Sequence, residues 1–270
     1  MTLKTLPLSE DGTRLSYREA GEGAPLVLIH GVGMQSAAWA PQFPALSRRC
    51  RVLALDMPGH GGSSPLAVDA ELPDFVAWLD RALGALGLGL VSLAGHSMGA
   101  LIAGGYAVTH SEKVARVALL NGVFRRSPEA RAAVEARAAE LHAGDVDIAA
   151  PLLRWFGEDR GHLTARESVA GWLAEVSPRG YATAYGAFSR GDDIYADRFA
   201  AIRCPLLALT GDQDPNSTPA MARAMADAAP EGRALVIEGH RHMVNLTAPD
   251  RVSQALIDWM ETPSTVEVTS

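Results

Sequence analysis

The sequence lacks several features that would assign it to whole classes of protein. Its 270 residues include only two cysteines, Cys50 and Cys204, which cannot form a disulfide framework. Both precede apolar runs, so we expect buried free thiols and a cytoplasmic protein. No apolar stretch approaches the roughly 18 residues of a membrane span. Residues 1–8 lack the basic start and apolar block of a signal peptide. We therefore predict no membrane association.

Basic charge and cofactor motifs are also scarce. Lys and Arg number 24 against 31 Asp and Glu, and the net charge of -7 argues against nucleic acid as a partner. Residues 31–36 lack the last glycine of a dinucleotide fingerprint, and the chain has no Walker lysine motif. The loop that begins at Asp212 has neither the glycine nor the glutamate of a calcium loop. We predict no cofactor, no metal and a small-molecule substrate, and leave the oligomeric state open, with a homodimer as one option.

What the chain does have is a regular alternation of apolar and helical segments. The apolar runs are nearly continuous, as expected for strands of a parallel sheet covered on both faces: 25–30, 51–56, 88–94, 114–121, 205–211 and 233–239. Helical patterns lie between them: 36–46, 72–86, 98–109, 219–228 and 250–260. Residues 2–8 and 13–19 suit an antiparallel hairpin at the sheet edge. The pattern predicts a doubly wound, mostly parallel α/β sheet of eight strands.

One interval, residues 124–195, contains helical patterns and no good strand. It holds eight of the 16 aromatic residues of the chain. These rings could serve the small core of a helical insertion, or they could line an apolar pocket beneath a cap. We expect both roles, with Trp155, Tyr181 and Phe188 as substrate-binding residues. The predicted organisation is a core of residues 1–123 and 196–270 with a helical cap at 124–195.

A serine between two glycines, in Gly95-His96-Ser97-Met98-Gly99, follows an apolar run and precedes a helical one. This G-x-S-x-G pattern is typical of a nucleophile elbow, whose sharp strand-to-helix turn needs residues without a Cβ. An acyl-transfer serine also needs a histidine base and a carboxylate that orients it. The loops after two later strands supply Gly211-Asp212-Gln213-Asp214-Pro215 and Gly239-His240-Arg241-His242. The order Ser, Asp, His is the one described for this type of fold.

These landmarks, together with Leu28-Ile29-His30-Gly31 and Asp56-Met57-Pro58-Gly59-His60-Gly61, make the chain resemble the α/β-hydrolase superfamily over nearly its whole length. The resemblance implies the eight-stranded fold with a cap inserted after the sixth strand. It also implies which side chain in each loop is catalytic. The acid would be Asp214, the third residue after a glycine, with a proline beside it. The base would be His242, which has a proline seven residues further on. The backbone amides of Val32 and Met98 would form the oxyanion hole.

The predicted reaction is hydrolysis of a small carboxylic ester or lactone through an acyl-serine intermediate. Residues 155–156, 178–181 and 188 resemble the cap of the 3-oxoadipate enol-lactone hydrolase branch. At the start of the predicted cap of this chain, Arg125 and its neighbour Arg126 could bind a substrate carboxylate, or they could be solvated surface arginines. The same triad would serve carbon–carbon hydrolysis of ring-cleavage products, amide or C–N hydrolysis, or perhydrolysis. A ligand receptor built on a hydrolase scaffold is a further alternative.

Overall fold

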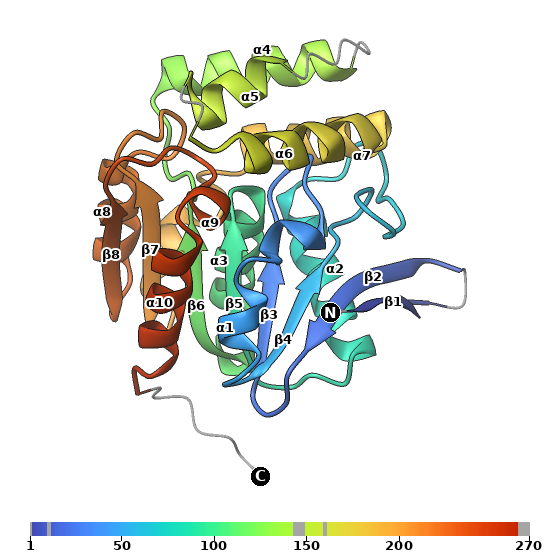
Figure 1. The fold of residues 1–270 in the computed structure, drawn as a ribbon, viewed down its shortest axis with the longest axis vertical. Coiled ribbons are helices and arrows are strands. Elements are labelled where there is room, and N and C mark those ends of the chain that lie inside the picture. The colour runs from blue at the N-terminus through green and yellow to red at the C-terminus, as the bar shows by residue number, and fades with distance from the viewer. Residues whose placement is uncertain (1, 10–11, 143–148, 159–160, 264–270) are drawn as a thin grey trace.

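A computed structural model describes residues 2–9, 12–142, 149–158 and 161–263 of the chain, which form one eight-stranded sheet with helices around it (Figure 1). The strand order is β1-β2-β4-β3-β5-β6-β7-β8. The strands are β1 (Thr2–Pro7), β2 (Arg14–Ala20), β3 (Pro25–Ile29), β4 (Arg51–Leu55), β5 (Val91–His96), β6 (Val114–Leu120), β7 (Leu206–Gly211) and β8 (Gly232–Ile237). Strand β2 runs antiparallel to both β1 and β4, and every pair from β4 to β8 is parallel. The predicted fold is confirmed.

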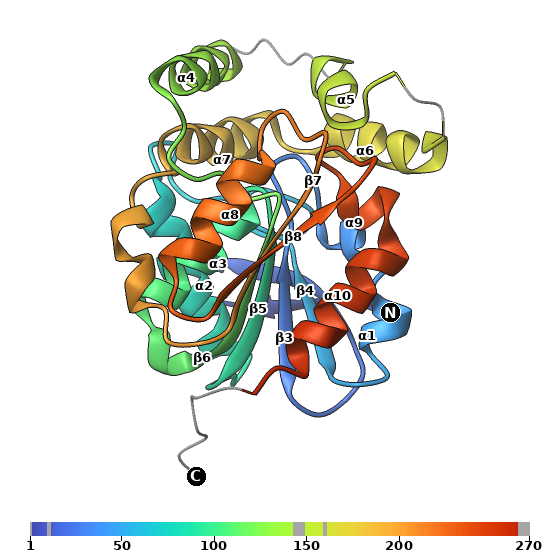
Figure 2. The ribbon, with the colours of Figure 1, turned by 90° about the vertical axis from the view of Figure 1, so that its left-hand side faces the viewer.

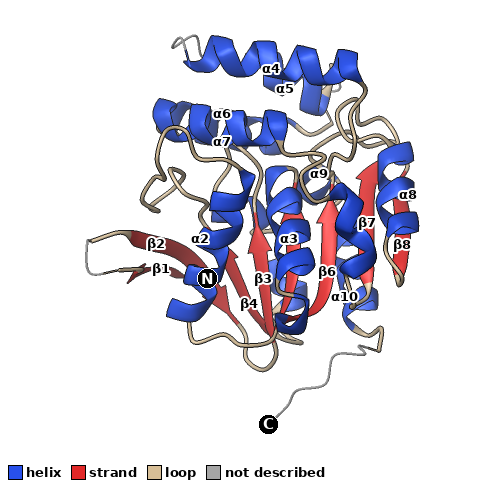
Figure 3. Cartoon of the chain, turned by 180° about the vertical axis from the view of Figure 1, so that it is seen from behind, coloured by secondary structure: helices blue, strands red, loops and turns tan. Residues whose placement is uncertain are grey.

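Helices cover both faces of this sheet (Figure 3). They are η1 (Ser36–Trp39), α1 (Phe43–Leu46), α2 (Leu72–Ala85), α3 (Met98–Thr109), η2 (Ser111–Lys113), η3 (Ala196–Ala201), α8 (Pro219–Ala228), α9 (Val244–Thr247) and α10 (Pro249–Met260). In β3, Leu26 and Leu28 pack in one apolar cluster with α1 and α10, while Val27 and Ile29 pack in the other with α2, α3 and α8. Successive strand residues face opposite sides, so a sheet buried on both faces needs continuous apolar runs.

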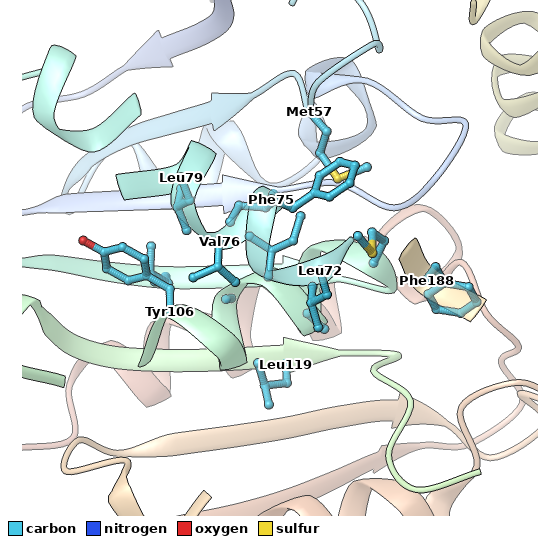
Figure 4. Close-up of a cluster of buried hydrophobic side chains, with 14 of the residues drawn as sticks. Met57, Leu72, Phe75, Val76, Leu79, Tyr106, Leu119 and Phe188 are labelled. Atoms are coloured by element: carbon cyan, nitrogen blue, oxygen red, sulfur yellow. The ribbon is translucent and has the colours of Figure 1, made fainter. Parts of the chain in front are cut away.

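The larger apolar cluster fixes α2 against α3 (Figure 4). Phe75 and Leu79 of α2 are fully buried, and Tyr106 of α3 is buried beside them. The tyrosine hydroxyl donates a 2.9 Å hydrogen bond to Asp80. This packing holds α3, and therefore the residue at its N-terminus, in a fixed position.

The helix expected at residues 36–46 is wrong in detail. The segment forms two short elements instead, η1 and α1. Pro41 and Pro44 lie between and within them. Because proline lacks an amide proton and clashes with the preceding turn, one continuous helix cannot form there.

Four more helices lie between β6 and β7 in the sequence: α4 (Pro128–His142), α5 (Ala149–Phe156), α6 (Leu163–Glu175) and α7 (Pro178–Arg190). They lie together beyond the carboxyl ends of the parallel strands (Figures 1 and 2). Helix α7 begins with Pro178, and the Ser177 side chain accepts a hydrogen bond from the Gly180 amide. We call α4–α7 the cap helices. Among the described residues, no helix is long and apolar enough to cross a membrane.

Candidate active site

Ser97 occupies the tight turn between β5 and α3. Its backbone has φ 56° and ψ -115°, a conformation that side-chain-bearing residues rarely adopt. A Cβ on Gly95 would overlap the Gly99 carbonyl oxygen, and a Cβ on Gly99 would overlap that of Ile29. Neither position has room for a side chain, so both must be glycine. The turn presents Ser97 at the carboxyl edge of the sheet.

His242 and Asp214 form a buried hydrogen-bonded pair. The ring Nδ1–H of His242 donates to the Asp214 carboxylate at 2.7 Å. The Asn121 side chain, at 2.8 Å, and the Asn216 amide, also at 2.8 Å, donate to the same carboxylate. Burial alone would raise the pKa of Asp214. The charge and hydrogen bond of His242, with the bonds from Asn121 and Asn216, outweigh burial and hold this pKa below its ordinary value. The carboxylate stays charged and can stabilise an imidazolium.

His96, the residue before the serine, is hydrogen-bonded to the loop that carries His242. Its ring Nε2–H donates to the His242 carbonyl oxygen at 2.8 Å, and the two rings lie 5.1 Å apart. Burial, followed by the nearby His242 charge, lowers the pKa of His96 to about 3. His96 is thus a neutral donor throughout the ordinary pH range.

Two further buried histidines hold the loop that carries Val32. His60 accepts a hydrogen bond from the Gly33 amide at 3.0 Å, and His30 accepts one from the Met57 amide at 2.9 Å. In the described part of the chain, the amides of Val32 and Met98 donate to no protein atom. Two unused donors beside a nucleophile are what an oxyanion hole requires.

A cavity of about 540 Å³ lies over Ser97, between the core loops and the cap helices. The cap side contributes residues of α4, α5 and α7, and the core side contributes the loops after the strands. Its described lining includes Val32, Ser97, Arg126, Val134, Arg137, Arg154, Trp155, Tyr181, Tyr185, Phe188, Asn216, Met221 and His242. The Trp155 ring stacks near His242, with centroids 5.9 Å apart.

Most residues predicted for the site meet at this cavity. Ser97, His242 and Val32 line it from the core, and Trp155, Tyr181 and Phe188 line it from the cap helices. Asp214 lies behind His242, and Met98 contributes its backbone at the N-terminus of α3.

Arg125, predicted to bind substrate, is not among the described residues that line this cavity. Its side chain is about half exposed and pairs with the exposed Asp197 at 2.5 Å, away from the cavity. The backbone of Arg125 has φ 48°, and this turn directs the next residue, Arg126, to the cavity wall instead.

Sequence reasoning missed other residues of the lining. Arg137 on α4 and Arg154 on α5 look like ordinary surface arginines in the sequence, and only the packing of these helices over Ser97 brings them to the cavity. Asn121, in the loop after β6, carries no signal in the sequence for such a role, but its side chain donates a hydrogen bond to Asp214. Of the described lining residues, none is acidic, although the whole chain has a net charge of -7. The cavity is therefore a cationic site in an acidic protein.

Comparisons with known proteins identify a family and several relatives. The profile of the family described as the alpha/beta hydrolase fold matches residues 24–249. The chain is 53% identical over 262 residues to an (E)-2-((N-methylformamido)methylene)succinate hydrolase of Acinetobacter baylyi, covering 97% of this chain and 99% of the relative. It is 28% identical over 243 residues to a putative carbamate hydrolase of Escherichia coli O81, covering 86% and 90% of the two chains.

Solved structures are similar over nearly the whole chain. A thermophilic esterase from Thermogutta terrifontis with malate bound is 27% identical, with a TM-score of 0.85 and coverage of 96% and 98%. An enol-lactonase from Burkholderia xenovorans LB400 is 28% identical, with a TM-score of 0.81 and coverage of 93% and 97%.

Proposed function

This chain belongs to the α/β-hydrolase family, and on that premise we propose that it hydrolyses an amide C–N bond in a small, acidic N-acyl substrate. The observation that carries the proposal is the cavity itself. Three arginines and no acidic residue lie among its described lining residues, which also include Ser97 and His242. Such a site favours anions over neutral substrates, because arginine forms charge-assisted hydrogen bonds to carboxylates.

The 53% identical relative supports the same chemistry. Its named substrate combines a formamide with a succinate, and therefore carries an amide carbonyl and two carboxylates. The putative carbamate hydrolase also has a name that implies cleavage next to nitrogen. These relatives favour the amide or C–N alternative over the ester or lactone predicted from the sequence. The esterase and enol-lactonase neighbours, at 27% and 28% identity, make ester or lactone hydrolysis the second candidate.

In the proposed reaction His242 takes the Ser97 proton as the serine oxygen attacks the formamide carbonyl. The tetrahedral oxyanion accepts hydrogen bonds from the Val32 and Met98 amides. Collapse of this intermediate breaks the C–N bond, and His242 gives its proton to the leaving nitrogen. Water, deprotonated by His242, then attacks formyl-Ser97 and releases formate and the free serine. Asp214 stabilises the imidazolium in both halves of the reaction.

The test is release of formate from (E)-2-((N-methylformamido)methylene)succinate by the purified protein, compared with hydrolysis of p-nitrophenyl acetate and of an enol-lactone. We expect the formamide to have the highest kcat/KM. Ser97→Ala should abolish its turnover, and Ser168→Ala, at a partly exposed position of α6, should not. A higher kcat/KM for the lactone, or full activity of Ser97→Ala, would overturn the proposal.

A further inference from the structure

Helix α7 presents a row of three aromatic rings to the cavity. Tyr181, Tyr185 and Phe188 are spaced by four and three residues, so they share one face of the helix. Neighbouring ring centroids lie 6.0 Å and 5.9 Å apart. The row extends for about 10 Å along the helix axis, from the rise of roughly 1.5 Å per residue.

Two rings of this row have an arginine in contact with them. The Arg126 guanidinium lies over the Phe188 ring, 4.4 Å from its centroid. The Arg137 Nε–H donates to the Tyr185 hydroxyl at 3.1 Å. Burial raises the pKa of the Tyr181 hydroxyl, and the positive charges of Arg154 and Arg137 partly oppose that rise. Arg154 lines the same cavity from α5.

The charge of Arg126 is already neutralised by a neighbouring carboxylate. Its side chain is 3% exposed and forms a 3.0 Å ion pair with Asp192, whose side chain is fully buried. The Arg126 amide donates to the same carboxylate at 2.6 Å. Arg131 also reaches Asp192, at 3.2 Å. This arrangement holds the start of the cap helices onto the loop after α7.

Arg137 and Arg154 differ from Arg126, because no carboxylate among the described residues pairs with either. Both are only half-buried, and both line the cavity that contains Ser97. Two guanidinium groups that line one cavity from separate helices, without a carboxylate partner among the described residues, suit an anion with two charged groups, since arginine binds carboxylates by paired N–H donors.

We propose that Arg137 and Arg154 each bind one carboxylate of a small dicarboxylate, while Arg126 has a supporting role with Asp192. This inference rests on the proposed function and specifies the substrate class. The two carboxylates would anchor the substrate on the cap helices, and its acyl group would extend toward Ser97. Neither arginine is a catalytic residue, and both determine specificity.

Binding can be measured without turnover, which separates this inference from the proposed reaction. The probe is 2-methylidenesuccinate, a dicarboxylate without an acyl group to cleave, titrated calorimetrically into the Ser97→Ala protein. We expect Arg137→Met and Arg154→Met, each added to Ser97→Ala, to weaken binding about 10- to 100-fold, as for loss of a charge-assisted hydrogen-bonded pair. The mono-methyl ester of the probe should bind the parent protein weakly and lose affinity in only one of the two variants.

The matched control is Arg125→Met in the same background, which removes an arginine that pairs with Asp197 outside the cavity. It should leave the affinity within about twofold. Arg137→Lys and Arg154→Lys keep the charge and should restore part of the affinity if the Met variants fold poorly. Equal affinity in all variants, or an equal loss in Arg125→Met, would overturn the inference. Tight, arginine-dependent binding without formate release by the wild type would reject the proposed reaction and leave this inference standing.

Discussion

Three buried histidines around the active site should make this protein lose stability as the pH falls below about 6.5. His30, His60 and His96 are each at most 2% exposed. Burial lowers the pKa of all three, and the pKa of His60 and of His96 falls to about 3. Each ring is hydrogen-bonded to the backbone of a loop at the site. His60 contacts the loop that carries Val32, His30 contacts the loop after β4, and His96 contacts the loop that carries His242.

The size of the effect follows from proton linkage. The unfolded chain binds a proton at each histidine near pH 6.5, whereas the folded protein binds none at His60 or His96 until about pH 3. Because the unfolded state binds more protons, the free energy of unfolding decreases as pH falls through this window. Between pH 7.5 and 5.5 His60 and His96 should each cost about 1.4 kcal/mol, together about 3 kcal/mol, and His30 adds to the loss in the same direction. That is a large part of a typical net stability of about 5–15 kcal/mol.

The assay is urea unfolding, followed by tryptophan fluorescence, at pH 7.5, 6.5 and 5.5. His60→Asn, which offers an oxygen to the Gly33 amide but cannot be protonated, should reduce the loss of unfolding free energy by about 1.4 kcal/mol. Ser168→Ala, which removes no ionisable group, is the control and should keep the wild-type pH dependence. A loss below about 1 kcal/mol in the wild type, or an unchanged loss in His60→Asn, would refute the reasoning.

Three other outcomes follow from the site and its surroundings. Asp214→Asn should lower kcat about 10⁴-fold in stopped-flow or steady-state assays while circular dichroism stays unchanged, because His242 loses the carboxylate that stabilises its charged form. Gly99→Ala should lower the free energy of unfolding by roughly 1–3 kcal/mol or more, since the new Cβ would overlap the Ile29 carbonyl oxygen; an unchanged urea midpoint would contradict this. Cys204 should resist Ellman's reagent at pH 8 in the folded protein and react once urea is added, because burial raises the pKa of its thiol to about 12.

Much of the fold could be predicted because each element carries its own local signal. The strands from β3 to β8 are continuous apolar runs, and the helices α2, α3, α8 and α10 begin and end within one residue of their predicted limits. The exception, at residues 36–46, has a local cause in Pro41 and Pro44. Strand order follows from the resemblance to a known family, because no local pattern specifies which strands are neighbours.

The candidate site was predictable to the extent that it depends on spacing along the chain. The loops after β7 and β8 carry Asp214 and His242, and the structure joins them by a 2.7 Å hydrogen bond. Asn121 could not be predicted as the group that holds Asp214, because the loop after β6 meets the loop after β7 only in the folded sheet.

By itself, the sequence determined the alternation of strands and helices, the glycine-flanked turn at Ser97 and the order of serine, acid and base, since these depend on neighbouring residues. Only the tertiary structure decided which charges face the substrate. Arg125 and Arg126 are adjacent in the chain, yet one pairs with Asp197 at the surface and the other lines the cavity. Arg137 and Arg154 come from separate helices, and they reach the same cavity because α4, α5 and α7 all contribute to its wall. The direction of a side chain across a cavity depends on such long-range packing, which local sequence does not specify.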